Sequence, residues 1–255
     1  MKAVRFHRHG GPEVLVVEEV PLPEPGPGEV RVRVRAAALN HLDLWVRRGL
    51  PLRIEMPHVG GSDFAGVIEA TGPGVDGARI GTRVAGYPLL ACGRVPWPRC
   101  GDALDGPLSI LGEERSGACC EALVLPDACC VPIDDALAFE EAAAIPVAFL
   151  TAWRMLAGRA ALRAGETLLV LGASSGVGTA AVQIVLAVTS GTERAARVRA
   201  LGADEVIDRS RERIAARVLT LTGRRGANVV FEHVGEATWN ESLRAAAFGG
   251  RIVTC

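Results

Sequence analysis

Short hydrophobic runs with alternating polar positions dominate the first half of the chain. In the segment 29–37, Val30, Val32 and Val34 alternate with mostly charged residues, and this period of two predicts a half-buried β-strand. Comparable runs occupy 1–7, 14–20, 66–70 and 83–86. Short strands between Gly- and Pro-rich turns predict a small β-barrel or sandwich that ends near residue 130.

Near residue 135 the pattern changes to alternating helical and strand-like segments. Helical periodicity covers 139–144, 148–157, 192–201, 209–222 and 238–247, and β-type apolar runs cover 168–171, 184–189, 204–207, 228–232 and 251–254. This alternation predicts a parallel, doubly wound sheet. We therefore predict an α/β chain of two domains, a β-rich domain over 1–130 and a nucleotide-binding domain over 131–255.

The first crossover of the predicted parallel sheet is short. Only about a dozen residues separate Leu171 from Ile184, which is the lower limit for a turn, a helix and a return to a parallel strand. Either this helix has barely two turns, or the segment 184–188 continues it and a strand is missing.

A glycine-rich turn follows the apolar run 168–171 and precedes a helix-compatible segment. A dinucleotide pyrophosphate needs this order, because the free N–H groups of the first helical turn bind the anion. Gly172 permits a tight turn, Gly176 lets the backbone approach the phosphates, and Gly178 allows close helix–strand packing. The spacing G-x-x-x-G-x-G also suits an ordinary glycine-rich loop. The predicted cofactor-binding residues here are Gly172, Ala173, Ser174, Ser175, Gly176, Val177 and Gly178.

Composition narrows the class of partner. The chain has 255 residues and a net charge of −1, which argues against a nucleic acid or an anionic membrane as partner. No run is long enough to span a membrane, and the N-terminus lacks the apolar core of a signal peptide. Seven cysteines, an odd number, suggest reduced thiols in a cytoplasmic protein.

Several short motifs occur in an order that is typical of one protein family. They are Gly11-Pro12-Glu13-Val14-Leu15, Asn40-His41-Leu42-Asp43, Gly60-Gly61-Ser62-Asp63, Ala142-Ala143-Ala144-Ile145-Pro146, the glycine turn, Leu201-Gly202-Ala203-Asp204 and Gly249-Gly250-Arg251-Ile252-Val253. With them the chain resembles the medium-chain dehydrogenase/reductase superfamily, in particular its quinone-oxidoreductase and zinc-binding dehydrogenase members. The resemblance implies a GroES-like N-terminal domain, a Rossmann domain and an active site in the cleft between them.

The resemblance does not extend to the zinc ligands of the family. Zinc members carry Cys, His and Cys where this chain has Asn40, Ser62 and Val147, and these three residues cannot together hold Zn²⁺. The structural-zinc segment retains Cys92 in place, while Cys100 is displaced. We therefore expect no zinc at either position, although His41 and Asp63 remain as isolated metal-binding side chains.

Without a metal, the chemistry expected by resemblance is hydride transfer from a nicotinamide cofactor to a small-molecule substrate, a quinone or enone. The resemblance places Asn40, Asp43 and Thr151 near the nicotinamide and Val234-Gly235 beside its ribose. His41 is a candidate phosphate contact by the same analogy. Each has a structural alternative: Asn40 as a turn residue, Asp43 as a helix cap, Thr151 as a hydroxyl bonded to its own helix backbone and His41 as a partly exposed structural side chain.

The choice of cofactor depends on the segment after the predicted strand 184–189. An NAD site carries an acidic residue there. This chain has Ser190, Thr192 and Arg194, which suit the 2′-phosphate of NADPH, although the hydroxyls could merely cap a helix. Glu193 in a shifted register would instead suit NADH, so NADPH is favoured and NADH is the alternative.

The chain ends at Cys255, where family members continue, so it has the pattern of a C-terminally truncated member. We expect an NAD(P)H-dependent oxidoreductase and a homodimer, the usual assembly of the family. One alternative is a relative of the zinc-type alcohol dehydrogenases. The other is a non-catalytic remnant that binds nucleotide weakly.

Overall fold

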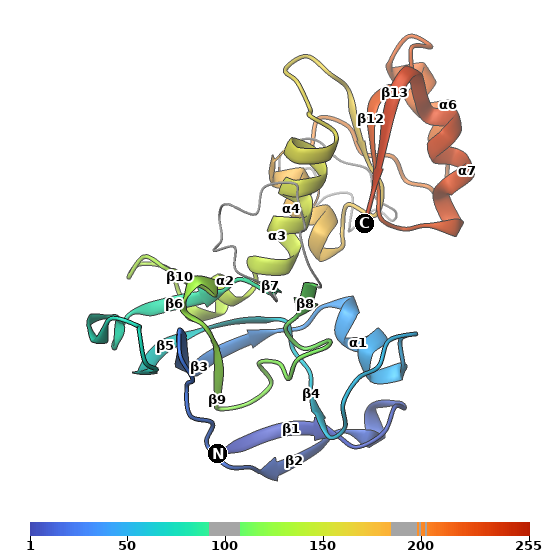
Figure 1. Ribbon diagram of the computed structural model, residues 1–255. Coiled ribbons are helices and arrows are strands. Elements are labelled where there is room, and N and C mark those ends of the chain that lie inside the picture. The colour runs from blue at the N-terminus through green and yellow to red at the C-terminus, as the bar shows by residue number, and fades with distance from the viewer. Residues whose placement is uncertain (92–107, 185–197, 199, 202) are drawn as a thin grey trace. The chain divides into compact units, whose positions relative to one another are not determined.

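A computed structural model describes all residues except 92–107, 185–197, 199 and 202 (Figure 1). Two compact units divide the chain, Met1–Val147 and Ala148–Cys255. The sequence placed the domain boundary at 130/131, whereas the segment 131–147 belongs to the first unit. The reason is packing: helix α2 (Phe139–Ala143) lies against strands β3 (Glu29–Ala38) and β5 (Asp63–Thr71).

The N-terminal unit is built from antiparallel sheets, as the alternating pattern predicts. A five-stranded sheet has the order β10-β6-β5-β3-β9, and a three-stranded sheet has the order β2-β1-β4. Strands β7 and β8 form a separate pair. The strands not yet given are β1 (Lys2–Phe6), β2 (Val16–Glu19), β4 (His58–Val59), β6 (Arg83–Gly86), β7 (Leu89–Ala91), β8 (Leu108–Ile110), β9 (Ala122–Pro126) and β10 (Cys130–Pro132).

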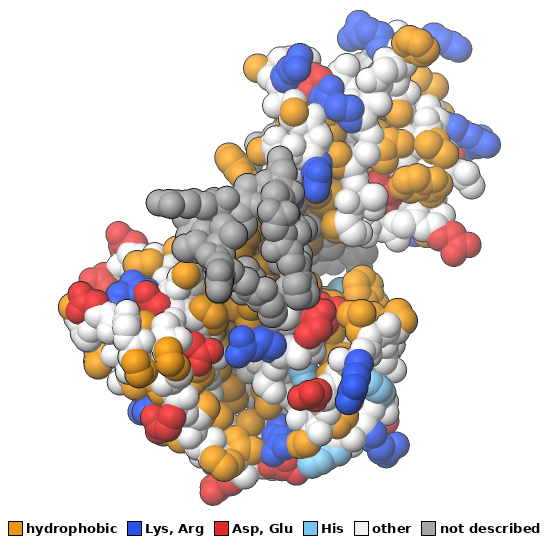
Figure 2. Space-filling model, in the orientation of Figure 1, with side chains coloured by type: hydrophobic (Ala, Val, Ile, Leu, Met, Phe, Trp, Pro, Cys, Tyr) orange, Lys and Arg blue, Asp and Glu red, His pale blue; other side chains and the backbone are white. Residues whose placement is uncertain are grey.

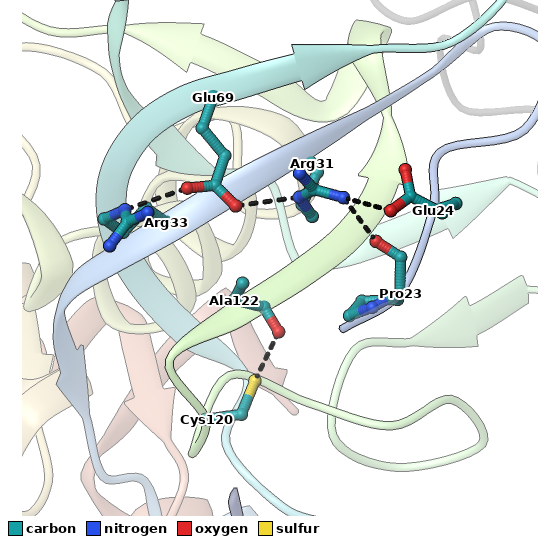
Figure 3. A network of polar contacts seen from close by, with 7 residues as sticks. All are labelled: Pro23, Glu24, Arg31, Arg33, Glu69, Cys120 and Ala122. Carbon is teal, nitrogen blue, oxygen red and sulfur yellow. Dashed lines mark hydrogen bonds and ion pairs between the residues drawn. The ribbon is translucent and has the colours of Figure 1, made fainter. Parts of the chain in front are cut away.

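Strand β3 shows how the alternation is used. Val30 and Val32 are fully buried in the core of the unit. On the other face Arg31 and Arg33 both bind the Glu69 carboxylate, with Nε–O distances of 2.7 and 2.8 Å (Figure 3). Because Glu69 lies on β5, these ion pairs join the two central strands across the face that is not in the core.

The helices of the N-terminal unit are short. Helix α1 (His41–Arg48) follows β3 directly, and its buried Val46 packs with Phe6 and Ile54. The described part of the unit also contains three single 3₁₀ turns, namely η1 (Pro12–Val14), η2 (Gly77–Arg79) and η3 (Asp127–Cys129).

The C-terminal unit contains a parallel sheet in the order β11-β12-β13, formed by Leu168–Val170, Ala227–Glu232 and Ala246–Thr254. Its core includes Val170, Val229 and Phe231. The helices with described bounds are α3 (Pro146–Trp153), which begins at the boundary, the π-helical η4 (Arg154–Arg159), α4 (Gly176–Ile184), α6 (Ile214–Leu221) and α7 (Glu236–Ala245).

Two expectations for this unit need correction. The segment 204–207 was expected to be a strand, but the structure assigns none there. Val206 and Ile207 are buried, and a short apolar run does not distinguish a buried irregular segment from a buried strand. The expected helix 209–222 begins only at Ile214. Ile184 ends α4, and the expected strand residues 185–189 and most of the expected helix 192–201 lie outside the described residues.

Acidic and basic side chains are interspersed on the visible face of the N-terminal unit, in keeping with the net charge of −1 (Figure 2). Among the described residues no helix is both long enough and apolar enough to cross a membrane.

Candidate functional site

The glycine turn joins β11 to α4. Gly172 has a φ of +60°, a backbone conformation that favours glycine. A Cβ built on Gly178 would lie 2.3 Å from the carbonyl oxygen of Gly172, so only glycine fits between the turn and the helix. A Cβ built on Gly176 would meet nothing closer than Ala148, at 3.8 Å, so the fold alone does not require this glycine. A bound phosphate that approaches the backbone would require it.

The N-terminus of α4 offers backbone donors to an anion. The Ser175 hydroxyl accepts the N–H of Gly178 at 3.0 Å and so caps the helix. The first N–H groups of a helix have no acceptor within it, which makes Gly176 and Val177 the candidate donors. Ser174 and Ser175 are exposed beside them, whereas the Ala173 side chain is buried in the core. Ala173 can therefore contribute only its backbone.

A second turn, residues 233–235, follows β12 and lies against the glycine turn. A Cβ built on Gly172 would lie 3.0 Å from Cγ2 of Val234 and 3.1 Å from the His233 ring. His233 Nε2 is 3.4 Å from the Ser175 hydroxyl oxygen. Burial lowers the pKa of His233. The structure thus brings the predicted Val234 and Gly235 together with the predicted glycine turn.

In the N-terminal unit, Asn40 and Asp43 lie at the beginning of helix α1. One Asp43 oxygen accepts the backbone N–H of Asn40 at 2.6 Å, and the other accepts the N–H of Gly61 at 3.0 Å. Burial raises the pKa of Asp43. Because both oxygens bind backbone donors, Asp43 acts as a helix cap that also holds the loop before β5.

Asp63, at the first position of β5, holds the side chain of Asn40. The Nδ2 group of Asn40 donates to Asp63 Oδ2 at 2.9 Å, and the backbone N–H of Val147 donates to Asp63 Oδ1 at 2.9 Å. Burial, with a smaller contribution from the Asp43 charge, raises the pKa of Asp63 to about 6. The Asn40 carboxamide is therefore fixed by a carboxylate that is only 2% exposed.

The other predicted residues have looser surroundings. His41 is exposed and stacks edge-on against Trp45, with the ring centroids 5.6 Å apart. Thr151 is half-buried in α3, within the C-terminal unit. The residues expected to determine the preference for NADPH or NADH lie outside the described residues; they are Ser190, Thr192 and Arg194. Cys92 and Cys100 also lie outside them.

The donor set does not fit a catalytic zinc ion. Asn40 and Val147 supply an amide and a backbone N–H that already bind Asp63, and the buried Ser62 hydroxyl is a poor zinc ligand. Within the described part of the chain, no three His, Cys, Asp or Glu side chains are grouped so as to hold a metal. Burial also raises the pKa of the nearby Cys119 thiol to about 11, which favours its protonated form.

Comparison with known proteins identifies the family. The model of the alcohol dehydrogenase GroES-like domain matches residues 26–135, and that of the zinc-binding dehydrogenase matches residues 176–255. A quinone oxidoreductase of Pseudomonas aeruginosa is 37% identical over an alignment 260 residues long, which covers 99% of this chain and 72% of that protein. The chain belongs to the medium-chain dehydrogenase/reductase superfamily. The expected GroES-like and Rossmann-type parts are thereby confirmed.

Two further relatives show the breadth of the family. A crotonyl-CoA reductase of Streptomyces collinus is 33% identical over 94% of this chain and 64% of that protein. A crystal structure described as an NAD-dependent alcohol dehydrogenase is 45% identical and superposes with a TM-score of 0.93, over 99% of this chain and 76% of that one. The chain is thus a member of a family of nicotinamide-dependent oxidoreductases, and it spans about three quarters of the length of such relatives.

The sequence does not reveal the roles of two buried carboxylates, Asp63 and Glu232, or of His233 beside the glycine turn. Asp63 was considered only as an isolated metal ligand, and its hydrogen bond to Asn40 depends on β5 lying beside the beginning of α1. Glu232 and His233 were not singled out at all. The one signal available was a carboxylate directly after the apolar run Val229–Phe231, a place where burial is to be expected.

Proposed function

We propose that this chain transfers hydride from NADPH to a quinone or conjugated enone without a catalytic metal. The observation that supports this best is the Asn40–Asp63 hydrogen bond at 2.9 Å. A carboxamide has two N–H protons, and the bond to Asp63 uses one of them. The second N–H proton of the Asn40 carboxamide could donate to an oxygen of the substrate. This hydrogen bond would stabilise the negative charge that develops on that oxygen during reduction.

The other predicted residues would bind the cofactor and orient the substrate. The backbone N–H groups of Gly176 and Val177 would bind the pyrophosphate, and the turn at Val234 and Gly235 would lie along the nicotinamide ribose. Thr151 and Asp43 would orient the substrate side, Asp43 indirectly through the Asn40 backbone. The bound cofactor would supply the hydride, and the one proton that completes the reduction would come from solvent.

NADPH is proposed over NADH from Ser190, Thr192 and Arg194, because hydroxyls and a guanidinium suit a 2′-phosphate. The 45% identical crystal structure is described as NAD-dependent, which favours the alternative. Fluorescence titration of the purified protein with each cofactor decides between them. A higher affinity for NADH would refute this part of the proposal.

An alcohol dehydrogenase is the second candidate, favoured by the description of that same crystal structure. The two functions predict different turnover. A reductase oxidises NAD(P)H with quinones or enones and is indifferent to chelators, whereas an alcohol dehydrogenase reduces the oxidised cofactor with an alcohol and requires a metal.

The deciding experiment measures both reactions with the same preparation, before and after dialysis against chelator and with its metal content determined. Asn40→Leu is the test variant, and Leu39→Ala, an exposed neighbour, is the matched control. Chelator-sensitive alcohol oxidation would refute the proposal. Tight cofactor binding without any turnover would instead favour a non-catalytic nucleotide-binding protein. Sedimentation of the same sample tests the expected homodimer.

A further inference from the structure

Glu232 is a fully buried carboxylate at the end of β12. Its Oε1 accepts the backbone N–H groups of Val234 at 2.8 Å and Gly235 at 3.0 Å. The Thr238 hydroxyl lies 2.9 Å from Oε1 and 2.8 Å from Oε2, and the Ser242 hydroxyl donates to Oε2. Every hydrogen-bond donor that the structure gives this carboxylate therefore lies in the turn 233–235 or in helix α7.

No arginine or lysine forms an ion pair with Glu232 in the described part of the chain. A carboxylate taken out of water without a cation is costly, and an apolar residue of the same size is often as good for stability or better. What the carboxylate supplies instead is a defined conformation, because the backbone N–H groups of Val234 and Gly235 would otherwise be free to turn.

That conformation is set next to the glycine turn. The same Val234 side chain lies 3.0 Å from a Cβ built on Gly172, and the His233 ring lies 3.1 Å from it. Gly235 has a φ of +86° and is followed by the first residue of α7. Both N–H groups point at Glu232, and in a planar trans peptide the carbonyl oxygen points the opposite way. The carbonyl of Val234 is therefore directed away from Glu232.

From this geometry we infer that Glu232 is a positioning residue for the nicotinamide half of the cofactor. It ties down the turn 233–235, keeps Val234 against the glycine turn and directs the Val234 carbonyl toward a hydroxyl donor of the cofactor. This inference rests on the proposed function, since it assumes that the turn lies beside the nicotinamide ribose. Glu232 itself does not touch the cofactor.

The test compares the whole dinucleotide with a fragment that lacks the nicotinamide riboside. Glu232→Met keeps the side-chain length and removes the acceptor, and we expect its Kd for NADPH or NADH to rise about tenfold or more. The Kd for ADP, or for the 2′-phosphorylated fragment, should change by less than about twofold, because the glycine turn is untouched. If Glu232 were needed only for folding, its substitution would raise the Kd of the dinucleotide and of the fragment by the same factor.

Glu232→Gln should rescue most of the affinity. Its amide oxygen can accept both N–H groups, while the Thr238 and Ser242 hydroxyls rotate to accept from its NH₂ group. Glu241→Met is the matched control, because Glu241 also accepts a backbone N–H, but its partner is Ala215 of α6 rather than the turn 233–235. This control should lower the melting temperature without changing the ratio of the two affinities.

If Glu232→Met does not fold, Gly235→Ala decides, because the built Cβ has no neighbour within 4 Å and only the positive φ is disturbed. Gly223→Ala, also at positive φ in open space, is its control. Unchanged NAD(P)H affinity in the test variants, or equal loss of dinucleotide and fragment, overturns the inference. A wild-type chain that binds fragment and dinucleotide equally weakly overturns the proposed function as well, and with it this inference.

Discussion

Replacing the Asp63 carboxylate by an amide should remove a large part of the pH dependence of stability. Asp63 is 2% exposed, and its pKa is raised from 3.8 to about 6, mainly by burial. The pKa of Asp63 is higher in the native state than in the unfolded state. The stability that the protonated carboxyl group contributes is therefore fully present below pH 3.8 and is lost as the pH rises through about 6. At about 1.4 kcal/mol per pKa unit, ionised Asp63 costs the native state roughly 3 kcal/mol.

Asp63→Asn can keep the geometry. Its carbonyl oxygen would accept the N–H of Val147, and its NH₂ group would donate to the oxygen of a flipped Asn40 carboxamide. The variant should match the wild type near pH 4 and exceed it by up to roughly 3 kcal/mol near pH 8. Urea unfolding at a series of pH values, followed by fluorescence, gives both curves, and titrating groups that do not interact with Asp63 cancel in the difference.

Two results would refute this reasoning. A constant difference between the two curves would mean that the Asp63 pKa is ordinary and that water reaches the carboxylate. A variant that loses stability relative to the wild type as the pH rises would mean that the ionised form is the one the fold stabilises. The matched control is Asp76→Asn, which makes the same chemical change at an exposed cap whose side chain accepts the N–H of Ala78.

Three further predictions test the glycine turn, the side chain of Asn40 and two cysteine thiols. Gly178→Ala should destabilise the C-terminal unit by roughly 1–3 kcal/mol in thermal unfolding, because the Cβ would lie 2.3 Å from the Gly172 carbonyl, whereas Gly176→Ala should fold normally and weaken only the binding of NADPH or NADH. Asn40→Asp should reduce turnover without changing the cofactor Kd, since a second carboxylate facing Asp63 removes the N–H donor; equal loss of both would contradict the assignment. At pH 8, Cys119 and Cys129 should resist iodoacetamide in the folded protein, since partial or full burial raises the pKa of both thiols to about 11. Rapid labelling of either thiol would contradict its raised pKa.

The sequence predicts best those elements whose pattern is local. The alternation from Val30 to Val34 gives β3, and the run 83–86 coincides with β6. The glycine turn is found because Gly172 and Gly178 are required by backbone geometry alone, whatever the rest of the chain does. In each case neighbouring residues carry the whole signal.

The elements that depend on distant packing are not predicted. Val206 and Ile207 have the composition of a strand and are buried, yet the structure assigns no strand to them. The bond between Asn40 and Asp63 joins positions 23 residues apart, and nothing in either neighbourhood reveals it. The raised pKa of Asp63 follows from burial, which is a property of the folded unit rather than of the residue.

Three carboxylates of this chain show how the choice of partner decides what a substitution does. Glu69 is held by the charges of Arg31 and Arg33 (Figure 3), so an amide there loses the attraction of both guanidinium groups. Asp63 and Glu232 are more deeply buried and bind neutral donors, several of them backbone N–H groups. An amide oxygen can still accept these bonds, whereas an apolar side chain cannot. Asp63→Asn and Glu232→Gln should therefore preserve the backbone around Asn40 and the turn 233–235. An apolar substitution that removes the hydrogen-bond acceptor, rather than one that removes only the charge, should impair function.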